Sequence, residues 1–451
     1  MFKKIEIWVL YLIVLFSLLI AVGFGVLVRQ ELVGNIKAGW ISKSALTLAE
    51  IPVNIKKILT DGNLEVDDRF PNLNSFNGIP NSEETYLLLS RYDNDSKEGI
   101  IELVDLRNFQ VLHTWNPDID VFNDLVEQVD EFKYLRRDGR DKRQRLIHPK
   151  VTRDGGIVFN SSPLRKINIC SDLVFQNTHD YFHHSIETDG NGDIWVPSHL
   201  YPQTLPARTV GRETHVNNGF LDDAIVKLSP DGKIIFEKSV SQILMDNGLE
   251  YLLFSVGDML FDTDPIHLND IQPVNFDGEF WQKGDVFLSL RHQSMILLYR
   301  PSTNKIIWKG VGPFFHQHDI DILDNHRISI FNNKSKHFVN GQEVDGNNEV
   351  NIYDFKTDTY SSYMKDSLIE NDVRTITQGR SEILPNGELF IEETNYGRTL
   401  FFNSDGSLRW SHVNRAEDGK VYIVNWSRIL FTPEDIQSVK EVLTNTGACN
   451  E

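Results

Sequence analysis

A pair of β-hairpins recurs along the chain from about Thr85 to His412, and this repeat limits the possible folds more than any other feature of the sequence. One hairpin consists of an apolar strand, a polar turn and a second strand that often ends in an aromatic residue. Its six copies begin at Ile101, Ile167, Ala224, Met295, Val350 and Thr399. Alternating apolar residues around turns such as D-G and N-G are typical of β-hairpins.

A second hairpin precedes most of these copies, so that two hairpins form one four-stranded unit. Its copies begin at His148, His184, His267, His318 and Arg380, and the first copy is reduced to TYLLLSRYD around Tyr86. Six four-stranded units are typical of a β-propeller, in which small sheets repeat around a central channel. The sequence therefore predicts an all-β fold, a six-bladed β-propeller over residues 83–430, with a tail over residues 431–451.

The N-terminus carries a stretch of 22 residues, Ile7 to Val28, without a charged side chain. As a helix this stretch spans the ~30 Å hydrocarbon core of a bilayer. Lys3 and Lys4 favour a cytoplasmic N-terminus, with the remainder outside. A cleaved signal peptide is the alternative, although its apolar region is normally only ~7–15 residues long. We therefore predict a single-pass membrane anchor over residues 1–29 and a stalk over residues 30–82.

Composition excludes some functions and some sources of stability. The chain has 45 Lys and Arg against 64 Asp and Glu, a net charge of −19, which argues against a nucleic-acid partner. The two cysteines, Cys170 and Cys449, are far apart in the sequence. We therefore expect neither a disulfide scaffold nor a cysteine-rich zinc site, and stability should come from a buried core.

The repeat also predicts a site. In a propeller the first strand of each blade lines the channel, and all first strands begin at the same face. His148, His184, His267 and His318 begin four of these strands and Arg380 begins the sixth, so these side chains should converge at the mouth of the channel. The alternative is a set of unrelated, solvated residues at the rim.

Long insertions are predicted at that same face, and loops on a rigid scaffold often carry function. They are Asn116–Ile147, Leu200–Asp223, Val240–Ile266 and Lys334–Glu349. The first of them contains six basic residues, Arg136, Arg137, Arg140, Lys142, Arg143 and Arg145. Such a cluster could attract an anionic substrate, or it could be a solvated loop without a role.

Four segments resemble the bacterial arylsulfate sulfotransferases, over roughly residues 85–430. They begin at His183 (HHSIETDGNGDIWVP), His267 (HLNDIQPV, continuing to LSLRHQSMILLYR), Gly312 (GPFFHQHDIDILDNHRISIFNN) and Gln378 (QGRSEILPNGELFIEE). The most specific elements are R-H-Q at Arg291 and Q-H at His318. The resemblance implies a six-bladed propeller exported to the bacterial periplasm, here anchored in the inner membrane. It also implies transfer of a sulfuryl group from an aryl sulfate to a phenolic or related hydroxyl, without 3′-phosphoadenylyl sulfate.

The resemblance also implies roles for individual residues. His318 matches a nucleophile that becomes sulfated at nitrogen, and His184, His267 and Arg291 match residues that support catalysis. Substrate-binding candidates are His148, Arg380, His183 and His316, of which His183 could exchange roles with His184, and His316 with His318. The chemistry agrees: attack on sulfur needs a neutral imidazole, and the sulfuryl oxygens need cationic donors.

Two features of the family pattern are absent, and two alternative functions stay open. The stalk is too short for the family's N-terminal β-sandwich, and the usual nearby cysteine pair is missing, which leaves the oligomeric state and the acceptor open. We predict no metal and no cofactor, since no phosphate-binding GxxxxGK[ST] loop occurs. The alternatives are a metal-dependent lyase or hydrolase built on the channel histidines, against which Arg291 counts, and a non-catalytic propeller that binds anionic glycans or proteins.

Overall fold

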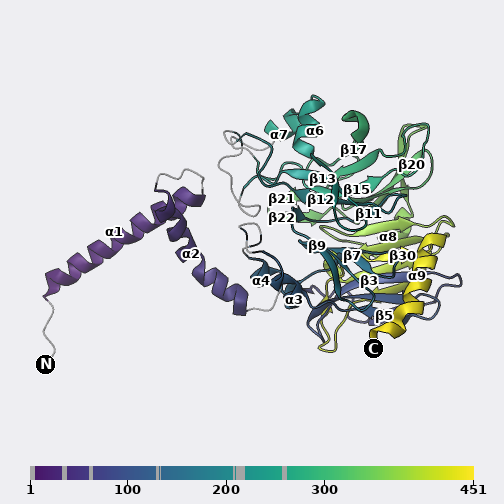
Figure 1. Cartoon of the computed structure of the whole chain (residues 1–451), viewed down its shortest axis with the longest axis horizontal. Coiled ribbons are helices and arrows are strands. Elements are labelled where there is room, and N and C mark those ends of the chain that lie inside the picture. The colour runs from purple at the N-terminus through teal and green to yellow at the C-terminus, as the bar shows by residue number, and fades with distance from the viewer. Residues whose placement is uncertain are drawn as a thin grey trace. The chain divides into compact units, whose positions relative to one another are not determined.

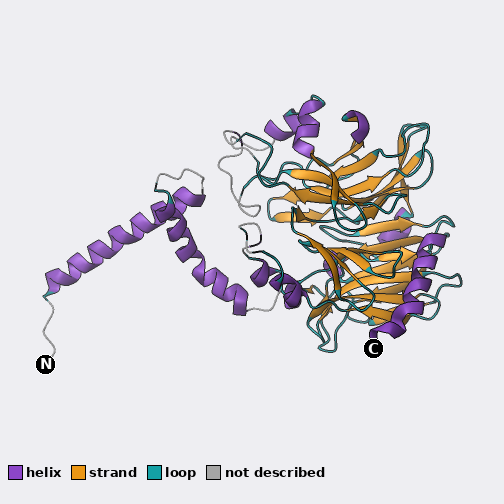
Figure 2. Ribbon diagram, in the orientation of Figure 1, coloured by secondary structure: helices purple, strands orange, loops and turns teal. Residues whose placement is uncertain are grey.

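The computed structural model describes residues 6–32, 38–59, 64–127, 129, 132, 134–206, 209, 219–255 and 262–450 of the chain. It divides into two compact units, Met1–Gly62 and Asn63–Glu451. Figure 2 shows that the first consists of helices and that strands dominate the second.

The first unit contains two helices, α1 (Ile7–Leu32) and α2 (Trp40–Leu59), the second of which includes Pro52. Over Ile7–Glu31, helix α1 has a mean hydropathy of 2.7 and is long enough to cross a membrane. Among the helices of the described residues it alone meets both conditions. This confirms the prediction of a single N-terminal apolar helix, which could be a membrane anchor or a signal sequence.

The second unit is a six-bladed propeller, as predicted (Figure 1). Each blade is an antiparallel sheet, and its inner strand comes first in the following list. The blades are β30 (Arg428–Leu430), β3 (Tyr86–Asp93), β4 (Glu98–Asp105) and β5 (Gln110–Trp115); β6 (Ile147–Val151), β7 (Ile157–Asn160), β8 (Leu164–Ile167) and β9 (Leu173–Asn177); β10 (Tyr181–Phe182) and β11 (Glu187–Thr188), β12 (Ile194–His199), β13 (Asp223–Leu228) and β14 (Ile234–Ser239); β15 (Leu268–Pro273), β16 (Val286–Leu290), β17 (Met295–Arg300) and β18 (Lys305–Val311); β19 (His318–Ile322), β20 (Arg327–Asn332), β23 (Glu349–Asp354) and β24 (Thr359–Tyr363); and β25 (Arg380–Ile383), β26 (Leu389–Glu393), β27 (Arg398–Phe402), β28 (Leu408–Val413) and β2 (Ser75–Gly78).

Shorter elements decorate the blades. A hairpin of β21 (Ser335–Phe338) and β22 (Gly341–Val344) is inserted between β20 and β23, and β1 (Glu65–Val66) pairs with β29 (Val421–Tyr422). The helices are α3 (Ile119–Asp124), α4 (Leu135–Asp138), α6 (Val240–Asp246), α7 (Tyr251–Phe254), α8 (Lys365–Glu370) and α9 (Pro433–Asn445), with 3₁₀ turns at Asp141–Arg143, Pro301–Thr303, Thr394–Tyr396 and Thr446–Asn450.

The core lies between the blades. Six buried apolar clusters each join two neighbouring sheets, and together they run around the whole ring. The cluster that closes the ring contains Leu87 and Leu89 of β3 with Phe390 of β26 and Trp410 of β28. Burying these side chains is the main source of stability in such a fold, at roughly 1.5–3 kcal/mol each.

The ring closes in a way that the repeat did not predict. The TYLLLSRYD segment is not a reduced first hairpin: it forms β3, the second strand of its blade. The inner strand of that blade is β30, which follows the sixth blade in the chain and pairs with β3 from Tyr86 to Leu88. Figure 1 shows β30 and β3 side by side although their colours mark opposite ends of the chain.

The expectation about the cysteines was wrong. Cys170, in the turn between β8 and β9, forms a disulfide bond with Cys449, after α9, across a sequence separation of 279 residues. Distance along the chain says nothing about distance in space once a propeller closes, because closure returns the C-terminus to the first blades. The bond ties the C-terminal segment to the second blade.

Candidate active site

Four of the predicted histidines lie together at the starts of inner strands. The ring centroid of His184 lies 5.0 Å from that of His267 and 6.3 Å from that of His318. Trp426, which precedes β30, lies 5.2 Å from His148, 6.1 Å from His184 and 6.0 Å from His318. These five side chains come from five different blades and form one cluster at the predicted face.

The backbone explains why side chains converge there. Each inner strand is entered through a non-glycine residue with positive φ, a conformation that is uncommon and often marks functional sites. The six residues are His148 (49°), His184 (58°), His267 (54°), His316 (50°), Gln378 (56°) and Trp426 (63°).

The strand pairing refines the register inferred from the sequence. Ile147 pairs with Asn160 and His318 pairs with Phe331, each three residues beyond the pair that closes the turn, so His148 corresponds to Asp319, which also has a positive φ (51°). His318 therefore lies one residue before the equivalent of His148, a difference that arises because β6 and β19 contain register shifts.

His318 is 1% exposed and belongs to a closed ring of hydrogen bonds. Its Nδ1 lies 2.7 Å from the Oδ1 of Asn333, whose own Nδ2 donates to the carbonyls of Gln378 (2.7 Å) and Thr375 (3.1 Å). These two donations fix the orientation of the amide, so Oδ1 faces His318 and must accept its Nδ1–H. The Nε2 of His318 therefore carries the lone pair, and it accepts a hydrogen bond of 3.2 Å from the backbone N–H of Gln378.

Burial keeps His148, His184 and His318 neutral. It lowers the pKa of His318 well below its usual value, and the positive charge of Arg291 lowers it further. Burial also lowers the pKa of His184, with a smaller effect from His183, and that of His148, with smaller effects from Arg428 and Arg380. A neutral imidazole is the form in which histidine acts as a nucleophile or metal ligand.

His267 forms a different arrangement, a pair with a carboxylate. Its Nδ1 lies 2.7 Å from the Oδ2 of Asp264, a residue that the sequence did not single out. Beside it, Nη1 of Arg291 lies 2.8 Å from Nε2 of His292, and the backbone N–H of Arg291 donates to the carbonyl of His267. A carboxylate that holds one imidazole nitrogen orients the other and supports the protonated ring, as in acid–base catalysis.

Three buried donors around the cluster have no hydrogen-bond partner among the described residues. They are Nε of Arg291, Nε1 of Trp426 and Nδ2 of Asn425. Buried donors are normally paired, and leaving one unpaired costs roughly 1–3 kcal/mol. Open donors next to neutral histidines are suited to the oxygens of an anionic group.

The remaining predicted residues lie around this cluster in different ways. His316 bonds through Nδ1 to the carbonyl of Ser335 in the β21–β22 hairpin, at 2.6 Å. His183 contacts His184 through their Nδ1 atoms, 2.8 Å apart. Arg380 lies deeper in the channel, where its guanidinium bonds to the carbonyl of Ser427 and lies 3.6 Å from Asp319.

A scan of family models finds one match, arylsulfotransferase (ASST), over residues 152–415, more than half of the chain. The chain belongs to the arylsulfotransferase family. No curated protein matches it. Within this arylsulfotransferase domain lie His184, His267, Arg291, His316 and His318, whereas Trp426 and Arg145 fall outside the matched range.

The solved structures that are similar to this chain match it only distantly. A protein of unknown function from Bacteroides caccae shares 11% identity with a TM-score of 0.44, over 73% of this chain and 94% of that chain. TolB from Acinetobacter baumannii shares 10% identity with a TM-score of 0.42, over 77% of this chain and 66% of that chain. A streptogramin B lyase shares 12% identity with a TM-score of 0.39, over 78% of this chain and 96% of that chain. TM-scores this low carry no argument about the site.

Three of the six basic residues in the predicted basic loop pair with acidic side chains. Arg136 lies 3.2 Å from Asp124, and Arg137 and Arg143 both pair with Asp138. Arg145 differs from these arginines because it belongs to the site: it donates to Oδ1 of Asn425 (2.7 Å) and to Oε1 of Gln378 (2.6 Å).

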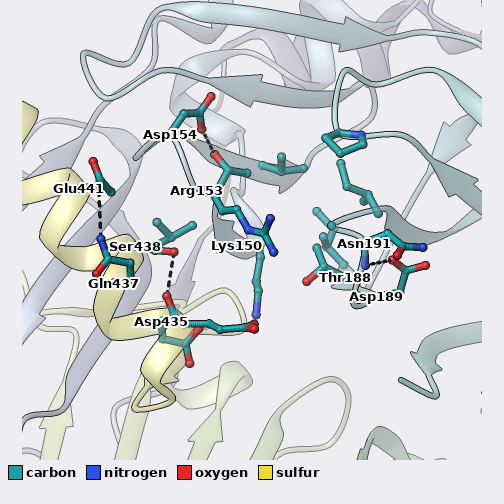
Figure 3. Close-up of a pocket in the computed structure, with 18 of the residues that line it drawn as sticks. Lys150, Arg153, Asp154, Thr188, Asp189, Asn191, Asp435, Gln437, Ser438 and Glu441 are labelled. Carbon is teal, nitrogen blue, oxygen red and sulfur yellow. Dashed lines mark hydrogen bonds between the residues drawn. The ribbon is translucent and has the colours of Figure 1, made fainter. Parts of the chain in front are cut away.

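A cavity of about 810 Å³ has none of the clustered histidines in its lining. Figure 3 shows residues that line it. It is bounded by the β6–β7 and β11–β12 turns and by the start of α9, and its lining includes Lys150, Arg153, Asp189 and Glu441. The histidines begin the inner strands and this cavity lies at their other ends, so it is not the predicted site.

Proposed function

We propose that the chain is an arylsulfate sulfotransferase that carries the sulfuryl group on Nε2 of His318, between an aryl sulfate donor and a phenolic or related hydroxyl acceptor. The observation that carries this proposal is the His318–Asn333 pair. A buried, neutral imidazole whose Nδ1–H is held by an oriented amide has its lone pair on Nε2, as nucleophilic attack requires.

The first half-reaction forms one bond and breaks one. The Nε2 lone pair of His318 forms the N–S bond while the bond between sulfur and the aryl oxygen breaks. This attack replaces the 3.2 Å hydrogen bond from the Gln378 amide. The leaving oxygen takes a proton from His267, whose Asp264 partner supports the protonated ring before transfer.

The second half-reaction reverses these roles. The acceptor hydroxyl gives its proton to His267, its oxygen forms a bond to sulfur, and the N–S bond breaks. Arg291, His184 and the open donors of Trp426 and Asn425 are suited to hold the sulfuryl oxygens during both steps. Neither step uses a metal or a nucleotide.

A location outside the cytoplasm fits this proposal. The apolar helix α1 could anchor the chain in the inner membrane with the propeller in the periplasm. The Cys170–Cys449 disulfide supports the same location, since disulfides persist mainly in oxidising compartments.

Mass spectrometry after incubation with donor alone tests the nucleophile. The full-length chain in detergent, mixed with 4-nitrophenyl sulfate, should gain one sulfuryl group on His318 and release 4-nitrophenolate. His318→Asn should form no adduct, and His184→Gln should form it ~10²–10³-fold more slowly, as for loss of one oxyanion donor. An adduct on His316 or His184 would show that the nucleophile is misassigned, and release without any adduct would exclude the two-step route.

A further inference from the structure

We propose that His183, His199 and Asp223 bind a Zn²⁺ ion beside the histidine cluster, through the two Nε2 atoms and Oδ1. His183 precedes the inner strand of its blade, His199 ends β12 and Asp223 begins β13, so three segments of one blade supply the ligands. The sequence predicted no metal ligands here, because these residues become neighbours only when β12 and β13 pair. The proposal does not depend on the proposed transfer reaction.

The geometry fits a tetrahedral ion. Oδ1 of Asp223 lies 3.4 Å from Nε2 of His183 and 3.3 Å from Nε2 of His199. With Zn–N and Zn–O bonds of ~2.0–2.1 Å, tetrahedral ligands are roughly 3.3–3.4 Å apart. The two imidazole rings lie together, with centroids 4.0 Å apart.

The hydrogen-bonding pattern leaves these atoms free for an ion. Among the described residues, Nε2 of His183 and Oδ1 of Asp223 are buried and form no hydrogen bond. The other oxygen of Asp223, Oδ2, accepts the backbone N–H of Leu268 at 3.0 Å, which fixes the carboxylate. The side chains of His183 and His199 are 11% and 13% exposed, so the group lies close to the solvent-accessible surface.

The carboxylate also favours a cation. The side chain of Asp223 is 0% exposed. Buried charges are normally paired or coordinate a metal. Two imidazoles and a carboxylate with an open fourth position are a ligand set that Zn²⁺ commonly takes.

The ion would affect the histidine cluster through one hydrogen bond. With Nε2 of His183 on the metal, its Nδ1 must carry the proton and donate to Nδ1 of His184, 2.8 Å away. His184 would then carry its own proton on Nε2. In terms of the proposed function, the metal would set His184 as a hydrogen-bond donor to a sulfuryl oxygen.

Two other groups of potential ligands fit less well. In the group of Asp264, His267 and His292, the nitrogens already bond to Asp264 and to the Arg291 guanidinium, a cation that repels a metal. The group of His179, Asp180 and Glu237 is open to water, with the His179 side chain 65% exposed.

Titration with Co²⁺ and Zn²⁺ tests the site without using activity. The metal-stripped full-length chain in detergent should bind one Co²⁺ with the visible absorption bands of a tetrahedral site, and Zn²⁺ should displace it. His199→Gln should weaken binding by at least the ~10–100-fold that loss of an outer-shell partner costs. Asp223→Asn should weaken Co²⁺ binding by a similar factor.

The matched controls are His179→Gln and His292→Gln, each of which removes one histidine from a rejected group. Both should bind Co²⁺ as the wild type does. The proposal is overturned if the wild type binds no Co²⁺ in a tetrahedral site, if His199→Gln binds as tightly as the wild type, or if His292→Gln is the variant that loses the ion.

Discussion

The tautomer of His318 depends on a single amide, that of Asn333. We expect Asn333→Ala to lower kcat by about one to three powers of ten with little change in KM, because the imidazole loses the acceptor that keeps its proton on Nδ1. Rapid-quench measurement of the sulfuryl adduct would show the loss in the first half-reaction.

A matched control exists on the surface. Asn325 accepts from Nδ1 of His326 at the same distance, 2.7 Å, away from the cluster. Asn325→Ala should leave kcat unchanged. Equal kcat values for Asn333→Ala and the wild type would remove the tautomer argument for His318.

The loss of rate on replacing Asp264 should depend on how weakly acidic the leaving phenol is. Asp264→Asn removes the carboxylate that supports protonated His267, so donors with weakly acidic phenols should lose far more rate than donors with acidic ones. A plot of log kcat/KM against the pKa of the phenol should therefore be steeper for the variant. Asp324→Asn, next to the partly buried His326, is the control. Parallel plots for Asp264→Asn and the wild type would show that Asp264 takes no part in proton transfer.

At the scale of elements, the turn before β25 contacts Nε2 of His318 through the backbone N–H of Gln378. Gly379 has a φ of +83°, and a Cβ there would lie 2.5 Å from Cγ2 of Thr375 and 2.9 Å from the carbonyl of Glu392. Gly379→Ala should therefore shift the Gln378 amide off His318, lower kcat at least tenfold and destabilise the fold by ~1–3 kcal/mol. Gly284→Ala, at φ +91° with nothing within 4 Å, should show only the smaller backbone cost in urea denaturation.

The inner strand β15 carries a buried acid whose titration should be visible in stability. Burial, with smaller effects from the charges of Asp319 and Glu187, raises the pKa of Asp270 to about 8. Between its unfolded pKa of about 3.9 and about 8 the folded state keeps a proton that the unfolded state has lost. The contribution of Asp270 to the free energy of unfolding is therefore fully present below pH ~4. It falls as pH rises toward about 8, by up to ~1.4 kcal/mol per pH unit.

Asp270→Asn removes this dependence while it keeps an oxygen for the backbone N–H of Ile320. The unfolding free energy of the wild type should fall relative to that of the variant between pH 6 and about pH 8, as measured by urea denaturation. Asp366→Asn, on exposed α8, should follow the wild type. Parallel curves for Asp270→Asn and the wild type would contradict the raised pKa.

The elements also show what the sequence could and could not predict. Hairpin periodicity located five of the six inner strands, because alternation and turn residues are local, and it brought His148, His184, His267 and His318 to one face. It missed β30, whose partner β3 lies at the other end of the chain. Asn333 and Asp264 escaped notice because their roles arise only from contacts. Gln378 and Trp426 were missed because what they share with the histidines is a backbone angle, and no residue type marks it.

At the scale of the whole molecule, the Cys170–Cys449 bond should matter for stability and little for catalysis. It joins the second blade to the C-terminal segment across a sequence separation of 279 residues, and removing a native disulfide typically costs ~2–5 kcal/mol. Cys170→Ser should lower the melting temperature, yet kcat at moderate temperature should hold, since Cys170 lies in an outer turn of its blade, away from the inner-strand starts.

The same outcome should follow from reduction of the wild type. Adding a reductant should lower its melting temperature to that of Cys170→Ser and leave the variant unchanged. A variant that melts with the oxidised wild type would mean that the bond contributes nothing to the folded state.

Strand β30 completes the first blade from a late position in the chain, so the order of synthesis decides when the site can form. A ribosome adds residues from the N-terminus onward, so all four clustered histidines exist well before Trp426 and Arg428 do. Until those residues arrive, the first blade lacks its inner strand, and β3 is paired on one side only, with β4. A nascent chain that stalls before Trp426 would thus carry all four clustered histidines and still lack the strand that completes the first blade, so the short segment from Trp426 to Leu430 should matter to the site as much as the histidines do.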